Sequence, residues 1–187
     1  MRPQLLVGAG PALRAATAGD HRGPRRSRGI GYGRSDWSIA NFAQDVEAVL
    51  AEEDVTDVTL VGHSLGGPVV LDAAIATQGC AAAVVGGDTF SDGWRQPSFS
   101  ERLEGIEDDY AGFVGRQRHA MFVAASTPAL VDRIMAAMAL QPVTSGIGAM
   151  RGLAAWAATR FMQALGALRV PLGLVATSDK LDGLNKL

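Results

Sequence analysis

The spacing of apolar residues predicts two helices and two strands in the first half of the chain. Four residues recur at helical spacing: Ile39, Phe42, Val46 and Val49. Ser38 precedes them and suits an N-cap, because its side-chain oxygen can accept from a free backbone N–H. Residues 57–61 and 81–86 are short and apolar, which is typical of buried strands. Residues 68–76 lie between these strands and predict a helix that ends by Gly79.

After the second strand the pattern becomes helical for about eighty residues. One helix is expected from Thr127-Pro128, with a single apolar face: Val131, Ile134, Met135 and Met138. A long helix is expected next, through Ile147, Met150, Trp156, Phe161 and Leu165. Residues 170–176 then return to a strand pattern. The chain therefore predicts a strand-and-helix core that a helical segment interrupts.

The most specific motif is Gly62-His63-Ser64-Leu65-Gly66, a G-x-S-x-G sequence between a predicted strand and a predicted helix. A strand that turns at once into a helix leaves little room, so Gly62 and Gly66 are expected where a Cβ would collide. Ser64 is expected at positive φ, with its hydroxyl clear of the backbone. The Leu65 N–H, at a helix N-terminus, points where an oxyanion would form. The alternative is a glycine-rich turn with an incidental serine.

This motif and three further segments resemble the α/β-hydrolase family, in the branch of esterases, haloperoxidases, dehalogenases and proline iminopeptidases. Residues 28–36 are similar to the loop after the family's fourth strand, 41–46 to the following helix, and 168–175 to the strand after the cap. The resemblance implies an α/β fold, a mostly parallel sheet flanked by helices and incomplete at both ends. Residues 29–187 would form this partial domain, with a helical cap inserted at about 90–166.

The resemblance also implies catalytic roles, in the chain order serine, acid, histidine. Ser64 would be the nucleophile. The acid is Asp179, after the post-cap strand and in the commoner family position, or Asp88, after the strand that follows the nucleophile. For each aspartate, the alternative is a surface or capping role.

The histidine has no counterpart in the expected place, because the chain stops before the strand that precedes it in the family. His21 lies in an irregular segment, His63 is expected on the other face of the strand end, and His119 is expected to be solvated. Two hypotheses follow. The protein is a serine hydrolase of small-molecule esters or related acyl substrates, or it is an inactive remnant of that fold, inert or serving as a binding or interaction module.

Composition and charge argue against several other classes of function. The chain has 187 residues, with 48% hydrophobic residues and a net charge of −2, which suits one globular domain and gives no general case for nucleic acid. No apolar run reaches the length of a membrane span, and no signal peptide is expected. The single Cys80 suits a reducing cytoplasm. Without a Cys/His cluster, neither metal nor cofactor is expected, and the sequence does not indicate an oligomeric state.

The first 28 residues form a basic segment without a clear period. Residues 1–35 hold seven arginines against a single acid, Asp20, and the prolines and glycines among them predict irregular structure. A transit peptide or an RNA- or membrane-binding arm would share this charge, but the favoured interpretation is a damaged, truncated or differently translated version of the family's second to fourth strands. Gly8-Ala9-Gly10 begins like a dinucleotide-binding loop, but Leu13 takes the place of its third glycine, so no nucleotide site is expected.

Overall fold

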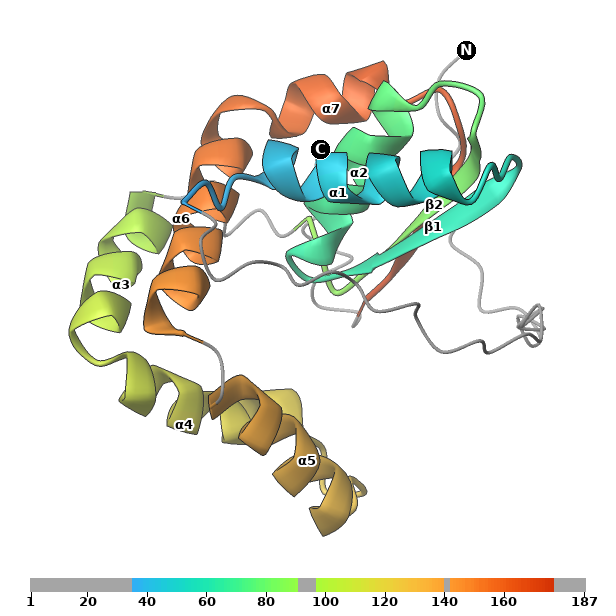
Figure 1. Ribbon diagram of the computed structural model, residues 1–187. Coiled ribbons are helices and arrows are strands. Elements are labelled where there is room, and N and C mark those ends of the chain that lie inside the picture. The colour runs from blue at the N-terminus through green and yellow to red at the C-terminus, as the bar shows by residue number, and fades with distance from the viewer. Residues whose placement is uncertain (1–34, 91–96, 140–141, 177–187) are drawn as a thin grey trace.

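The computed structural model of the chain describes residues 35–90, 97–139 and 142–176. Its strands are Val58–His63 (β1), Ala81–Gly87 (β2) and Leu172–Val175 (β3). Its helices are Ile39–Glu52 (α1), Gly66–Ala76 (α2), Pro97–Asp108 (α3), Tyr110–Met121 (α4), Pro128–Ala139 (α5), Val143–Thr159 (α6) and Phe161–Ala167 (α7). The strands form one parallel sheet in the order β1-β2-β3, flanked by helices (Figure 1). This is the α/β architecture that the sequence predicts.

Parallel pairing brings the carboxyl ends of the three strands together. His63 pairs with Gly87, and Gly87 pairs with Val175, so all three strands end in register. Two backbone hydrogen bonds extend this ladder by one residue. Ser64 N–H donates to the Gly87 carbonyl (2.9 Å), and Asp88 N–H donates to the Val175 carbonyl (2.7 Å). The residues directly after β1 and β2 are therefore held by the sheet itself.

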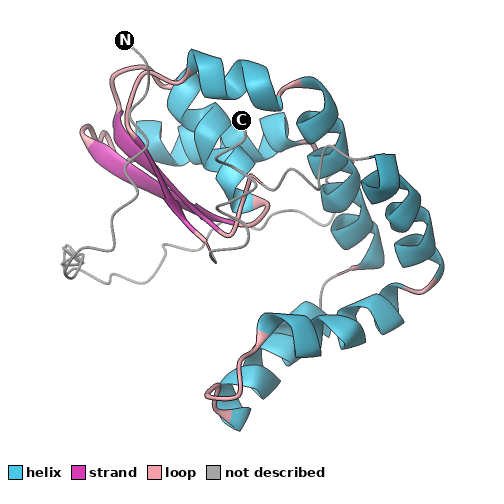
Figure 2. Ribbon diagram, turned by 180° about the vertical axis from the view of Figure 1, so that it is seen from behind, coloured by secondary structure: helices cyan, strands magenta, loops and turns pink. Residues whose placement is uncertain are grey.

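Helix α2 forms the centre of the core. Residues 67–74 are all buried, because α2 packs on β1 and β2 and contacts α1 and α7. Figure 2 shows helices gathered on one side of the sheet. A helix that is buried on all sides must be apolar all round, and α2 is, apart from Asp72. Leu71 of α2 and Val84 of β2 are completely buried at this contact. The helix that follows Ser64 is thus firmly anchored.

The face of β1 that points away from α2 is exposed. Along β1, Leu60 and Gly62 are buried under α2, whereas Thr59, Val61 and His63 alternate with them and point away. Val61 is 69% exposed. A parallel sheet ordinarily has both of its faces covered. The predicted flanking by helices is therefore present on one face within the described residues.

Helix α1 begins where the sequence predicts. The Ser38 hydroxyl caps it by accepting from a first-turn backbone N–H (3.3 Å). The buried stripe differs from the predicted one by one residue at its end. Val49 is 58% exposed, and Leu50 packs against the core instead. An ideal helix has 3.6 residues per turn, so a stripe that starts at Ile39 reaches position 50 in three turns.

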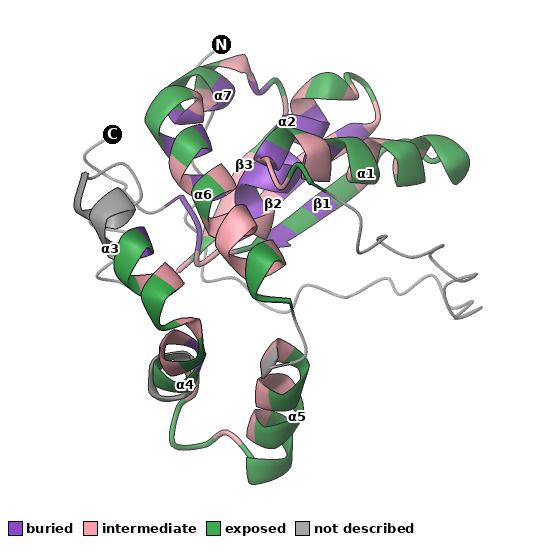
Figure 3. Ribbon diagram, turned by 60° about the vertical axis from the view of Figure 1, so that its left-hand side comes forward, coloured by how far each residue is buried: buried purple, intermediate pink, exposed green. Residues whose placement is uncertain are grey.

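The described residues between β2 and β3 form helices α3 to α7, here called the helical insertion. Helices α4 and α5 lie farthest from the sheet (Figure 1). The predicted apolar face of α5 is only half-buried: Val131, Ile134, Met135 and Met138. Figure 3 shows this helix in the colours of intermediate and exposed residues. The insertion is thus well packed near the sheet and sparsely packed at its far end.

The single long helix expected through Ile147 and Leu165 is in fact two helices. Helix α6 ends at Thr159, α7 begins at Phe161, and Arg160 between them has φ −118° and ψ −21°. The resulting change of direction buries Phe161 and Ala164 in the core beside α2. Apolar periodicity alone did not reveal this break, because apolar residues continue across it.

A buried carboxylate accounts for the position of this break. Asp72 of α2 is only 6% exposed, and a buried charge needs partners. The Trp156 indole N–H donates to its Oδ2 (3.0 Å), and Arg160 Nε donates to its Oδ1 (2.9 Å). Both donors come from the end of α6 and the break after it. Asp72 therefore joins α2 to the helical insertion.

We expect Asp72→Ala to lower the free energy of unfolding by about 2 kcal/mol, because the buried Trp156 N–H loses its acceptor. The cost stays below that of breaking a fully buried pair, since Arg160 can reach water. Urea denaturation followed by circular dichroism measures the change. The control is Glu52→Ala, at an exposed acid of α1, with an expected change under about 0.5 kcal/mol. Equal losses in the two variants would contradict this interpretation.

Candidate active site

Ser64 lies in the turn between β1 and α2, and its backbone is strained. Its φ is 51°, in the left-handed region, which costs a residue with a side chain about 1–3 kcal/mol. Only Ser64 and Leu65 separate the last residue of β1 from the first residue of α2. Ser64 is half-buried, and it lies outside the continuous helix. The backbone therefore has the conformation that the G-x-S-x-G motif predicts.

Three hydrogen bonds fix the main chain of Ser64. Its N–H donates to the carbonyl of Gly87, as described above. Its carbonyl accepts from the Gly67 N–H (2.9 Å) and from the Thr89 hydroxyl (2.6 Å). By contrast, no described residue forms a hydrogen bond with the Ser64 hydroxyl. The backbone is thus constrained from three sides, and the side-chain oxygen is left to other chemistry.

The backbone N–H of Leu65 is the neighbouring donor. Leu65 is the N-cap residue of α2, with φ −53° and ψ −30°, and its N–H bonds to no described residue. Helix N-termini carry unsatisfied N–H groups and a partial positive charge. A carbonyl group placed here could meet the Ser64 oxygen at its carbon and the Leu65 N–H at its oxygen. This pairing of groups is suited to acyl transfer.

The glycines of the motif differ in what they contribute. A Cβ on Gly62 would overlap the Gly66 carbonyl and lie 2.7 Å from the Gly67 nitrogen, so the turn needs glycine there. The expected collision at Gly66 is wrong, because a Cβ at this first residue of α2 would have open space. The second close approach is at Gly67, where a Cβ would overlap the side chain of Thr89. No local sequence pattern indicates a role for Gly67 or Thr89.

Of the two candidate acids, the structure describes one. Asp88 follows β2 at the carboxyl end of the sheet, on the strand paired with the one that ends before Ser64. It is half-buried and has a φ of 45°, so it is a second strained residue beside the turn. Its N–H is fixed by the carbonyl of Val175. Asp179 lies outside the described residues.

The described residues bring no histidine to the Ser64 hydroxyl. His63 is exposed on the uncovered face of the sheet, on the side away from α2. His119 belongs to α4, which lies away from the sheet (Figure 1). His21 lies outside the described residues. The geometry near Ser64 thus supplies a serine, a backbone donor and a carboxylate.

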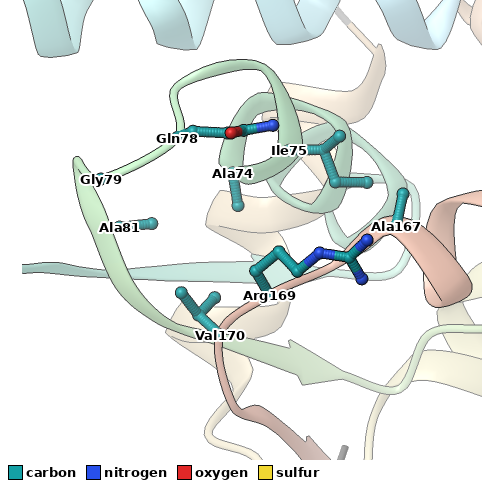
Figure 4. A pocket seen from close by; sticks show the side chains of 8 residues that line it. All are labelled: Ala74, Ile75, Gln78, Gly79, Ala81, Ala167, Arg169 and Val170. Carbon is teal, nitrogen blue, oxygen red and sulfur yellow. The ribbon is translucent and has the colours of Figure 1, made fainter. Parts of the chain in front are cut away.

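A cavity of about 230 Å³ lies at the other end of the sheet from Ser64 (Figure 4). It is formed where α2 ends, β2 starts and α7 ends, by aliphatic side chains with Gln78 and Arg169. The cavity is therefore separate from the serine turn.

Among residues 35–90, 97–139 and 142–176, no three His, Cys, Asp or Glu side chains cluster as metal ligands would. In the same ranges, every helix is too short or too polar to cross a bilayer.

Comparison with known proteins agrees with this geometry. A sequence model described as the alpha/beta hydrolase fold matches residues 15–186. The chain belongs to the α/β-hydrolase fold family. A search of curated protein sequences gives no significant match for this α/β-hydrolase chain.

Solved structures show the same fold. A hydrolase from Oleispira antarctica has a TM-score of 0.65 at 14% identity, over 80% of this chain and 60% of its own. An esterase from Exiguobacterium antarcticum has a TM-score of 0.66 at 14% identity, over 81% and 62% of the two chains. A bromoperoxidase from Bacillus anthracis has a TM-score of 0.61 at 17% identity, over 75% and 56%. This α/β-hydrolase chain therefore spans about 60% of the length of these proteins.

The motif glycines give a matched test of the turn. Gly62→Ala is expected to destabilise the protein by about 1–3 kcal/mol, because its Cβ overlaps backbone atoms that cannot move independently. Gly66→Ala should be neutral or stabilising by up to about 1 kcal/mol, since it adds a better helix former in open space. Chemical denaturation of both variants measures the difference. A larger loss at Gly66 than at Gly62 would contradict the described turn.

Proposed function

We propose that this protein is a serine hydrolase that acts on an ester or related acyl substrate through Ser64. The observation that carries the proposal is the left-handed backbone of Ser64 at a strand-to-helix turn, next to a helix N-terminus. Membership of the α/β-hydrolase fold family supports it. So do the names of the structural neighbours, which include a hydrolase and an esterase.

In the proposed reaction, the Ser64 oxygen attacks the carbonyl carbon of the substrate and gives its proton to a base. The carbonyl oxygen becomes an oxyanion and accepts a hydrogen bond from the Leu65 N–H. Collapse of this intermediate expels the alcohol, which takes the proton, and leaves the acyl group on Ser64. Water then attacks the acyl-enzyme and releases the acid and Ser64. Asp88 or Asp179 would orient the base.

The helical insertion would shape the substrate site as a cap. It leaves the sheet after β2, at the carboxyl end where Ser64 is placed, and returns to it at the amino end of β3. Its half-buried Met150 packs on the same apolar pair, Leu103 and Leu153, as Leu65 of the serine turn, and could line an apolar pocket for a small acyl substrate. We place the protein in the cytoplasm as part of this proposal, because a single cysteine suits a reducing compartment.

A second candidate function is a non-catalytic binding or interaction module on the same fold. It is favoured by one observation, that no histidine among the described residues contacts the Ser64 hydroxyl. In a known serine protease, loss of a triad member leaves only about 10³–10⁴-fold acceleration over water. The two candidates differ in whether Ser64 is an activated nucleophile.

A fluorophosphonate probe distinguishes these candidates, because it reacts covalently with activated serines. We expect wild-type protein to be labelled on Ser64 and Ser64→Ala to be unlabelled, as judged by gel fluorescence and peptide mass spectrometry. Ser145→Ala is the control, since Ser145 is a half-buried serine in the first turn of α6 whose hydroxyl donates to the Pro142 carbonyl. It should keep full labelling. Folded wild-type protein without label would favour the second candidate.

The orienting acid is tested by two variants, Asp88→Asn and Asp179→Asn. The variant that removes the acid should slow labelling strongly, by up to the roughly 10⁴-fold known for an orienting aspartate, because the base then has the wrong tautomer. The other variant should label within about threefold of wild type. Labelling time courses measure both rates. Two unchanged rates would exclude both aspartates from this role.

A further inference from the structure

We propose that Thr89 is a positioning residue for the active site, because its hydroxyl fixes the peptide unit between Ser64 and Leu65. This inference rests on the proposed function of that turn. Thr89 lies two residues after β2, and its side chain is directed back toward the turn between β1 and α2. Neither the serine motif nor the candidate acids include it.

The direct contact is a short hydrogen bond. The Thr89 hydroxyl donates to the Ser64 carbonyl at 2.6 Å, and Thr89 is only 5% exposed. The same carbonyl accepts from the Gly67 N–H, so both of its lone pairs have a partner. Water has little access to this buried hydroxyl. Removing it would therefore leave one side of the carbonyl without a donor.

This bond acts on the oxyanion donor through the geometry of the peptide. The Ser64 carbonyl and the Leu65 N–H belong to one planar peptide unit and point in opposite directions. A donor that fixes the carbonyl on one side therefore also fixes the direction of the N–H on the other. The orientation of this peptide plane also constrains the backbone conformation of Ser64, and this conformation determines the direction of the Ser64 side chain. Thr89 thus constrains both proposed reactive groups while contacting neither.

The neighbouring backbone leaves space for Thr89 at two glycines. A Cβ on Gly67 of α2 would overlap the threonine side chain, and a Cβ on Gly86 of β2 would lie 2.6 Å from its Cγ2. These glycines belong to different elements, and Thr89 fills the corner where the elements meet. A side chain that fits between two such surfaces has little freedom to rotate. The hydroxyl is therefore held in one direction.

Two contacts hold the strained backbone on either side of Thr89 in place. The residues on either side, Asp88 and Phe90, have φ values of 45° and 57°, which residues other than glycine rarely adopt. Phe90 is almost completely buried and its ring stacks on Phe161, with centroids 5.9 Å apart. The backbone is fixed on the other side by the bond from Asp88 N–H to Val175. Two anchors thus hold the strained segment that carries the threonine.

The test compares Thr89→Val, which removes the hydroxyl at nearly constant shape, with Thr89→Ser, which keeps it. Nuclear magnetic resonance of labelled protein reports the Ser64 carbonyl carbon shift and the Ser64 N–H to Hα coupling, which depends on φ. Fluorophosphonate time courses separate the reversible binding constant from the first-order labelling rate. If Thr89→Val does not fold, Thr89→Ala compared with Thr89→Ser makes the same comparison.

We expect Thr89→Val to change the Ser64 carbonyl shift and to lower the first-order labelling rate about tenfold, with reversible binding within twofold of wild type. Thr89→Ser should keep both signals near wild type. Equal losses in the two variants would overturn the inference, because packing rather than the hydroxyl would then matter. An unchanged carbonyl shift and labelling rate in Thr89→Val would also overturn it.

The two readouts keep this inference separate from the proposed function. If wild-type protein is not labelled, the proposed function fails, and the resonance data alone decide on Thr89. A carbonyl shift that changes in Thr89→Val and not in Thr89→Ser then still supports the positioning role. If wild type is labelled and Thr89→Val behaves like it in both measurements, the function stands and the positioning role is wrong.

Discussion

The orientation of one peptide unit, between Ser64 and Leu65, is the constraint on which the rest of this site depends. Its carbonyl is bound by Gly67 and Thr89, and its N–H is left at the N-terminus of α2. Because the unit is planar, a partner on either side determines the direction of both groups. The missing Cβ of Gly62 lets the helix approach closely enough for this arrangement. The geometry of the turn is thus a consequence of backbone packing.

This peptide is connected mechanically to more distant parts of the fold. Helix α2 starts immediately after it, and two turns later Asp72 binds Trp156 and Arg160 at the end of α6. A helix is stiff over two turns, so the helical insertion and the serine turn share one rigid element. On the other side, the segment that carries Thr89 is fixed by Phe90 against α7. Both connections lead from the insertion to Ser64.

The sequence predicted what depends on neighbouring residues, and it missed what depends on contacts between distant segments. The turn conformation and the Ser38 cap follow from local motifs and periodicity, and the mostly parallel sheet follows from the family resemblance that those motifs carry. Thr89 was missed because it lies 25 residues from Ser64, and no local pattern indicates that the two meet. Gly66 was given a steric role by its place in a motif, whereas only the path of α2 shows that Gly67 is the crowded position. The break at Arg160 was missed because its partner, Asp72, is 88 residues away.

The strain at Ser64 is itself an argument about function. Glycine would adopt a φ of 51° without the steric cost that a side chain meets there, and a turn built for stability alone would favour it. The serine hydroxyl does not recover this cost through any hydrogen bond to the described residues. The neighbouring groups are instead arranged around its backbone, by Gly87 on one side and Thr89 on the other. Strain that brings no hydrogen bond to the side chain is what a nucleophile requires, because its oxygen must stay available to a substrate.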